Sequence, residues 1–323
     1  MRTRLLLAAG SVAIALLPLI GSVFYMQLIS KVMVLAIFAM SLDLLVGYGG
    51  LVSLGHAAFF GAGAYAVALL SPRYDAASFW LTAPLSLALV ALLAALIGLF
   101  VVRASGVYFI MVTLAFAQML YYLFHDTKLG GGSDGIYLYA RPTVRIAGFK
   151  LVDLEKPVHF YYLVFALMLG VFFLLRRVLG STFGHALAGV RVNEQRMRSL
   201  GFSTFWYKLG AFVLAGALAG LAGYFAACQF GFVNPEILSW HYSGSVLMML
   251  ILGGMGRLYG AVVGAFAFVF LQEVLASETL FGAWAKHWQL PMGVFIVLVV
   301  LLAPRGLTGL TARSKLRHPA LDV

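Results

Sequence analysis

Few side chains in this sequence could do chemistry, and several of them fall in one glycine-rich stretch. Residues 47–66 read GYGGLVSLGHAAFFGAGAYA and place Ser53, Gly55 and His56 among apolar neighbours. A further polar residue, Gln118, lies within the apolar run TLAFAQMLYYLF. Hydroxyl, imidazole and amide groups in such surroundings could contact a polar solute that crosses a membrane. The sequence therefore suggests a translocation path that includes these four residues.

Close packing is a second explanation of the same stretch. Small residues let membrane helices approach each other, and this interpretation is favoured for Gly61 and Gly63. For Ser53 and His56 both explanations stay open, and an interhelical hydrogen bond would explain Gln118 equally well. Glycine is about 1 kcal/mol less favourable than alanine inside a helix. We therefore expect the glycines between residues 47 and 55 to interrupt a membrane helix.

Enzyme chemistry and metal binding have little support in the sequence. The segment GGGSDG at 130–135 lacks the lysine and the hydroxyl residue of a phosphate-binding loop. The histidines are scattered singly and Cys228 is the only cysteine, so no metal-ligand spacing is present. The longest loops are too short to bury a catalytic core. We expect no catalytic residue, no metal site and no internal disulfide.

The elements that must position these residues follow from composition. Of the 323 residues, 63% are hydrophobic and 10% are charged, and the mean hydropathy is +1.00. Globular proteins have roughly 25% charged residues, so we expect an all-α polytopic membrane protein, one domain over residues 1–323, with about ten helices. The expected spans are residues 5–24, 28–46, 51–70, 79–102, 106–124, 159–178, 209–230, 244–256, 258–276 and 288–303.

The distribution of basic residues predicts the orientation. Short loops rich in Lys and Arg stay in the cytoplasm, and this rule places both termini and the 179–208 loop inside. The 125–158 loop is then extracytoplasmic. A basic start followed by an apolar run could also be a secretory signal peptide, but no clear cleavage site follows, so an uncleaved first helix is favoured. The net charge of +11 fits this topology and anionic lipid, without a nucleic-acid partner.

The 179–208 loop contains a compact charged segment. Helical periodicity over residues 186–200 predicts one short helix that ends at Gly201. The segment includes Arg191, Asn193, Glu194 and Arg196, and it could present a rigid surface to a cytoplasmic partner. A solvated basic linker is the alternative.

Several motifs together resemble the permeases of branched-chain amino acid ATP-binding cassette importers, of the LivM type. The motifs are DLLVGYGGLVSLGHAAFFGAGAYA, GVYFIMVTLAFAQM followed by GGGSDG, ALAGVRVNEQRMRSLGFSTFWYKLGAF, GFVNPEILSWHYSGSVLMMLILGGMGRLYGAVVGA and PRGLTGL. They occur in the order and spacing of that family and cover most of residues 40–310. Asp43, where many relatives have asparagine, and Met197, where a small residue is usual, depart from the pattern.

This resemblance implies a subunit of the bacterial inner membrane that translocates branched-chain or related amino acids. The implied partners are a second, LivH-like permease, two cytoplasmic ATPases that bind ATP and Mg, and an extracytoplasmic solute-binding protein. The chain itself would hold no cofactor, and Arg191, Asn193, Glu194, Arg196 and Gly201 would couple it to the ATPases. A permease for urea or short amides, or an ion-coupled secondary carrier, remains an alternative.

Overall fold

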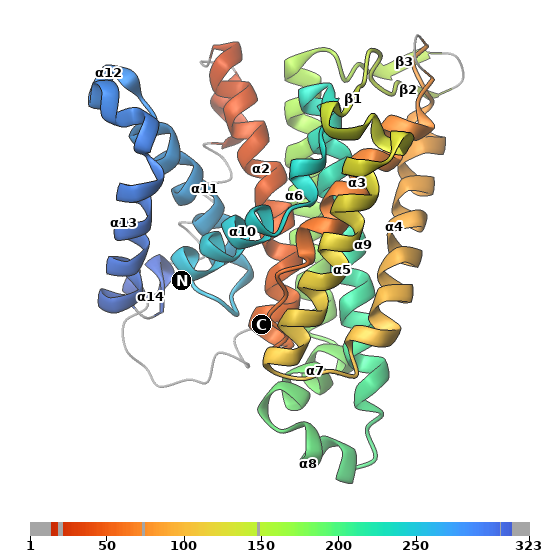
Figure 1. Cartoon of the computed structure of the whole chain (residues 1–323), viewed down its shortest axis with the longest axis vertical. Coiled ribbons are helices and arrows are strands. Elements are labelled where there is room, and N and C mark those ends of the chain that lie inside the picture. The colour runs from red at the N-terminus through yellow and green to blue at the C-terminus, as the bar shows by residue number, and fades with distance from the viewer. Residues whose placement is uncertain (1–13, 19–21, 73–74, 147–148, 304, 312–323) are drawn as a thin grey trace.

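The computed structural model describes residues 14–18, 22–72, 75–146, 149–303 and 305–311, and it is predominantly helical (Figure 1). The long helices are α2 (Val23–Asp43), α4 (Phe79–Val101), α5 (Val107–Asp126), α6 (Pro157–Leu179), α9 (Thr204–Phe230) and α11 (Leu258–Leu275). The shorter ones are α3 (His56–Leu70), α7 (Thr182–Val192), α8 (Glu194–Ser199), α10 (Trp240–Gly253), α12 (Glu278–Phe281), α13 (Gln289–Leu302) and α14 (Leu307–Thr311), and the apolar segment that begins with α13 extends to Gly309. The all-α, polytopic class expected from composition is confirmed.

The number of spans differs in detail from the expectation. Within the described ranges, seven helical segments are long and apolar enough to cross a membrane. Two other expected spans form α3 and α10, with 15 and 14 residues, fewer than the roughly 20 that a bilayer needs. The expected first span, residues 5–24, lies largely outside the described residues. The total of ten and the orientation therefore stay predictions.

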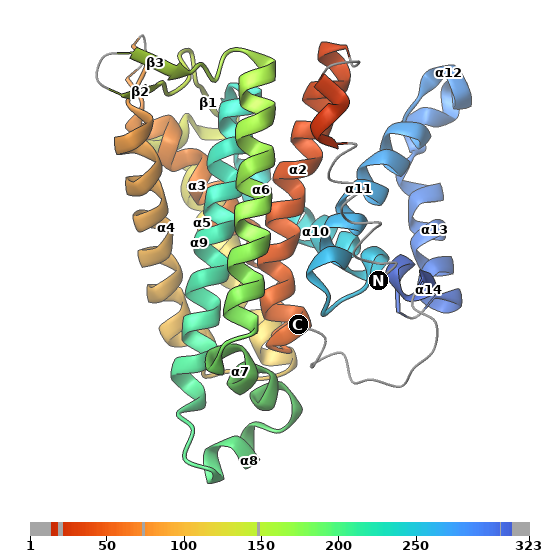
Figure 2. The same ribbon diagram turned by 180° about the vertical axis from the view of Figure 1, so that it is seen from behind.

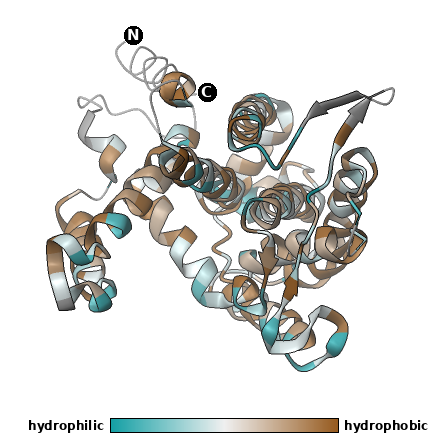
Figure 3. Cartoon of the chain, turned by 90° about the horizontal axis from the view of Figure 1, so that it is seen from above, coloured by the Kyte–Doolittle hydropathy of each residue, from teal (hydrophilic) through white to brown (hydrophobic). Residues whose placement is uncertain are grey.

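Two central helices, α2 and α9, organise the packing. In their most apolar windows 89% and 78% of the residues are buried, against 17% for α5. The outer helices are hydrophobic on outward faces as well as inward ones, as Figure 3 shows from above. A helix that is apolar on all sides is suited to contact with lipid. Its backbone N–H and C=O groups bond to each other within the helix, because lipid offers them no hydrogen-bond partners.

The helices form two similar units that run in opposite directions. In each unit a long helix (α2 or α9) is followed by a short one (α3 or α10) and by a third that packs on the long helix of the other unit. Thus α4 packs on α9, and α11 packs on α2. Figure 1 shows α2 and α9 running antiparallel, and likewise α4 and α11. The two units are therefore related by an inverted arrangement.

The two long loops lie at opposite ends of the helices. The 125–158 loop contributes β1 (Ile136–Tyr137), which pairs antiparallel with β4 (Phe232–Val233), and the hairpin of β2 (Val144–Ile146) and β3 (Phe149–Val152). The 179–208 loop forms α7 and α8, which project beyond α6 and α9 at the other end (Figures 1 and 2). Short 3-10 turns complete the connections: η2 (Lys128–Gly130), η3 (Gly132–Asp134), η4 (Pro235–Leu238) and η5 (Gly282–His287).

Candidate translocation and coupling site

The helix interruption predicted from the glycines is present. Helix α2 continues into a π-turn, η1 (Leu44–Tyr48), and the chain then leaves the helix until α3 begins at His56. Gly50 has φ +68°, a left-handed conformation that glycine adopts without strain. We call residues 47–55 the helix break. Single π-turns within helices occur frequently at functional sites.

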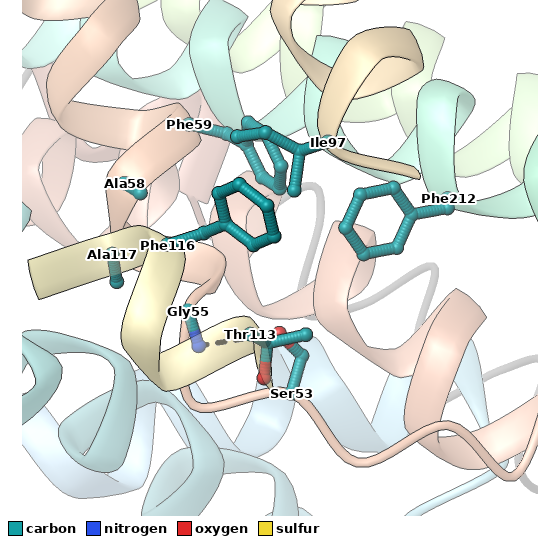
Figure 4. A pocket seen from close by; sticks show the side chains of 9 residues that line it. All are labelled: Ser53, Gly55, Ala58, Phe59, Ile97, Thr113, Phe116, Ala117 and Phe212. Atoms are coloured by element: carbon teal, nitrogen blue, oxygen red, sulfur yellow. Dashed lines mark hydrogen bonds between the residues drawn. The ribbon is translucent and has the colours of Figure 1, made fainter. Parts of the chain in front are cut away.

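A small cavity lies beside the helix break (Figure 4). One side is polar, because Ser53, Gly55 and Thr113 line it, and Gly55 N–H donates to Ser53 Oγ at 3.2 Å. The other side is apolar, and the residues that complete the lining are Ala58, Phe59, Ile97, Phe116, Ala117 and Phe212. The space open to the centre of a water-sized sphere is about 10 Å³, roughly what one water molecule needs. The cavity is therefore almost closed in this structure.

The four predicted path residues are not all at this cavity. Ser53 and Gly55 line it, whereas His56 lies in the contact between α2 and α3. His56 Nε2 is 2.9 Å from Ser41 Oγ, and its ring stacks on Phe38 at a centroid distance of 5.4 Å. Gln118 is half-buried on α5 and does not line the cavity. The structure therefore brings together two of the four residues, and it adds Thr113, which the sequence analysis did not single out.

The glycines of α3 make close helix contacts. A Cβ at Gly63 would collide with Gly220 O of α9, and one at Gly61 would reach Leu238 at 2.5 Å. Both observations agree with the packing interpretation. A Cβ at Gly55 would likewise collide with Thr113 O, so this cavity residue also serves a close contact between the helix break and α5.

The segment expected to form one helix over residues 186–200 is divided into α7 and α8. Asn193 has an extended backbone (φ −158°, ψ 100°), and its side chain accepts a hydrogen bond from Arg196 N–H at 2.9 Å. Asparagine is a favourable N-cap because it satisfies a backbone donor that the first helical turn leaves free. The single-helix prediction was therefore wrong, because this cap starts a second helix. Gly201, with φ +87°, follows that helix as expected.

Glu194 ties α8 to the start of α9. Its Oε1 is 2.9 Å from Lys208 Nζ and 2.6 Å from Arg198 Nη2, and it accepts a hydrogen bond from the Thr204 hydroxyl at 3.1 Å. Burial alone would raise the pKa of Glu194, but the hydrogen bonds from Lys208 and Arg198 outweigh it and lower that pKa. The carboxylate is thus engaged within the chain, whereas Arg196 is exposed on α8.

Arg191 and Asp43 lie where α7 meets the helix break. Arg191 Nη1 donates a hydrogen bond to Gly47 O. Asp43 is fully buried, and its Oδ1 accepts a hydrogen bond from Gly256 N–H at 2.8 Å. The sequence analysis mentioned Asp43 only as a departure from the family pattern, because its partner is 213 residues away. In the sequence, the only indication that Asp43 has a structural role is that an acidic residue stands close to a glycine cluster.

Comparison with known proteins identifies the family. Residues 24–303 match the family described as "Branched-chain amino acid transport system / permease component". The chain is 29% identical to the high-affinity branched-chain amino acid transport system permease protein LivM of Escherichia coli, over 99% of this chain and 78% of that protein. LivM of Salmonella typhimurium is also 29% identical, over 96% and 76%. No solved structure matches the chain.

A partial similarity extends to a second kind of importer. The chain is 32% identical to the autoinducer 2 import system permease protein LsrC of Klebsiella pneumoniae, over 49% of this chain and 44% of that protein. All these relatives are permeases, the membrane subunits of ATP-binding cassette transport systems rather than enzymes. The resemblance seen in the sequence and the multi-pass membrane location are thus confirmed. The chain belongs to the family of branched-chain amino acid transport system permease components.

Proposed function

We propose that this permease translocates branched-chain or related amino acids that a solute-binding protein delivers. The family match over residues 24–303 and the names of the LivM relatives support this substrate class. The supporting observation in the structure is the largely buried helix break beside a cavity with one polar and one apolar side. Interrupted backbone at membrane depth is tolerated where it is buried in protein or lines a wet cavity.

The two sides of the cavity suit the chemistry of such a substrate. A branched-chain amino acid has charged groups at one end and an aliphatic side chain at the other. Ser53, Gly55 and Thr113 offer hydroxyl and backbone groups, and the aromatic side chains of Phe59 and Phe116 offer apolar contact. A cavity of about 10 Å³ is too small for an amino acid. Transport therefore requires the helices around it to move apart, as in alternating access.

The proposed assembly lies in and on both sides of the bacterial inner membrane and contains four other subunits. They are a second, LivH-like permease, two ATPases and a solute-binding protein, with lipid around the permeases. In this proposal ATP and Mg bind to the ATPases and not to this chain. The projecting end with α7 and α8 contacts an ATPase, and exposed side chains there include Arg196, Leu200 and Trp206.

Reconstituted uptake tests the proposal. The complete complex in liposomes is expected to accumulate labelled leucine, isoleucine or valine only when ATP and the solute-binding protein are both supplied. A preparation without the ATPases is the control. Uptake by that control under an ion gradient would instead identify a secondary carrier. Accumulation of urea or short amides, but not of the amino acids, would show that the substrate class is wrong.

Two substitutions separate a role in the path from a role in helix packing. Ser53→Ala removes a lining hydroxyl and is expected to lower uptake while the complex still assembles. His56→Ala removes the contact with Ser41 and is expected to lower the yield of assembled complex, because the imidazole lies between α2 and α3. Normal uptake by Ser53→Ala at normal yield would exclude that side chain from the path.

A further inference from the structure

Arg191 occupies an unusual place for a side chain of a cytoplasmic loop. It lies in the last turn of α7 and is exposed overall, yet its guanidinium reaches the helix break and donates to Gly47 O. Its aliphatic part lies on Gly50, where a Cβ would be 2.8 Å from Arg191 Cγ. Only glycine leaves room for the arginine at that turn. The side chain therefore contacts the helix break at two points.

The acceptor is a carbonyl that the helix itself leaves free. The last carbonyls of a helix lack N–H partners within it, and the nearby donors Gly49 N–H and Leu51 N–H go to Leu44 O and Leu45 O at 3.1 and 2.9 Å. A helix C-terminus also carries partial negative charge, which a cation stabilises. Arg191 supplies both a donor and a positive charge to this end of α2.

A third segment meets the same point. The turn at residues 254–257 joins α10 to α11, and Gly256 N–H in that turn donates to Asp43 Oδ1 at 2.8 Å. A Cβ at Gly47 would lie 2.5 Å from Gly256 N, so the turn and the helix break are in backbone contact. The other carboxyl oxygen, Asp43 Oδ2, is buried without a hydrogen-bond partner. One guanidinium thus lies where α7, the helix break and the α10–α11 turn converge.

We propose that Arg191 is a positioning residue that locks α7 to the helix break and, through it, to the α10–α11 turn. A displacement of α7 then moves the end of α2 directly, whereas α8, held by Glu194 to the start of α9, moves the other unit of the inverted pair. The two contacts connect one cytoplasmic loop to both units. The inference rests on the proposed function only for the source of that displacement, an ATPase.

The first experiment measures the number of amino acids imported per ATP hydrolysed by the reconstituted complex. Arg191→Met keeps the aliphatic part and removes the donors, and it is expected to lower this ratio about tenfold while ATP hydrolysis persists. Arg191→Lys keeps a donor and a charge and is expected to recover part of the loss. Arg177→Met, the same change at an exposed arginine in the last turn of α6, is the matched control and is expected to keep the ratio within about twofold.

Two results of that experiment would contradict the inference. An unchanged ratio in Arg191→Met would show that α7 does not act through this contact. An equal fall in Arg191→Met and Arg177→Met would indicate a general effect of lost charge at this end of the helices. A loss of stability alone would lower the amount of active complex without changing the ratio.

A second experiment needs neither ATPase nor substrate. Amide hydrogen exchange is measured at residues 44–51 of the full chain in lipid nanodiscs. Loss of a hydrogen bond to a charged group raises local opening by about tenfold, so Arg191→Met is expected to speed exchange there by that factor and Arg177→Met is not. Equal exchange in all three proteins would refute the lock. Should Arg191→Met not accumulate, Arg191→Gln replaces it in both experiments.

The two experiments separate this inference from the proposed function. A wild-type complex that imports no amino acid would contradict the proposed function alone, because the exchange experiment would still report whether Arg191 holds the helix break. Exchange that is unaffected by Arg191→Met would contradict the lock even in a working importer.

Discussion

Gly55 belongs both to the cavity and to a tight contact with α5. A Cβ there would collide with Thr113 O, which is backbone and cannot rotate away. Gly55→Ala is therefore expected to destabilise the chain by about 1–3 kcal/mol, as overpacking does, and to lower uptake. Thermal unfolding in detergent measures the first effect. The matched control is Gly170→Ala on α6, where a Cβ would meet nothing within 4 Å; an equal loss in both variants would contradict the contact.

The charge of Glu194 makes the docking of α8 dependent on pH. Its pKa in the folded protein lies below the ordinary value of 4.5, because hydrogen bonds from Lys208 and Arg198 outweigh the effect of burial. The stabilisation is therefore complete above that ordinary value and is lost as the pH falls through the lower folded pKa. Limited proteolysis of residues 193–203 is expected to accelerate over that acid range. Glu194→Gln should be cleaved at a rate independent of this titration, and a wild-type rate without any acid step would contradict the assignment.

At the same scale, the sequence predicted the cavity residues better than the charged contacts. Ser53 and Gly55 stood out as a hydroxyl and a helix breaker in apolar surroundings, which is a local property. Asp43 could not be interpreted in the same way, since its burial depends on a backbone N–H of a distant turn. Pairings across such sequence separations follow from how helices pack, and one sequence does not reveal them.

At the scale of elements, α8 depends on its cap. Asn193 Oδ1 accepts from Arg196 N–H, and replacing such a cap by alanine costs about 1 kcal/mol. Asn193→Ala is therefore expected to raise amide exchange in residues 194–199 several-fold without affecting α6. Ser199→Ala, at the exposed end of the same helix, is the control. Continuous helix through residue 193 in the variant, with unchanged protection of α8, would contradict a role for the cap.

Hydropathy predicted most of the helices, because each long span must satisfy its backbone internally. The prediction failed for residues 186–200, where the two short helices α7 and α8 together have the periodicity of one helix. Leu187 and Val190 are buried on α7, whereas α8 buries no residue, so the apolar phase over residues 186–200 did not represent one buried face. The helix break was predictable from its glycines, but the start of α3 at His56 was not, because it depends on Ser243 Oγ accepting from Ala57 N–H at 2.8 Å.

At the scale of the whole molecule, the two loop regions should face opposite compartments. In a Cys228→Ala background, a cysteine at exposed Ser133 is expected to react with an impermeant thiol reagent in intact cells, and one at exposed Ser199 is not. The 125–158 loop and α8, which carry these two positions, lie at opposite ends of the helices (Figure 1). Permeabilised cells provide the control, since both cysteines should react there. Labelling of Ser199→Cys from outside would invert the predicted orientation.

The inverted arrangement itself was only partly predictable. Successive expected spans alternate in direction, so the sequence already implied that α2 and α9 run in opposite directions. The packing of α4 on α9 and of α11 on α2 could not be predicted in this way, because hydropathy does not say which helices are neighbours.

The glycine contacts between helices limit which amino-acid substitutions this sequence can accept during evolution. At Gly63, Gly223 and Gly264 an added Cβ would collide with a backbone carbonyl, of Gly220, Phe60 and Met249 respectively. When two side chains collide, a smaller partner can restore the fit, so the two positions vary together. A backbone carbonyl is the same whatever residue carries it. No second substitution at the partner position can therefore compensate, so these glycines can only be kept.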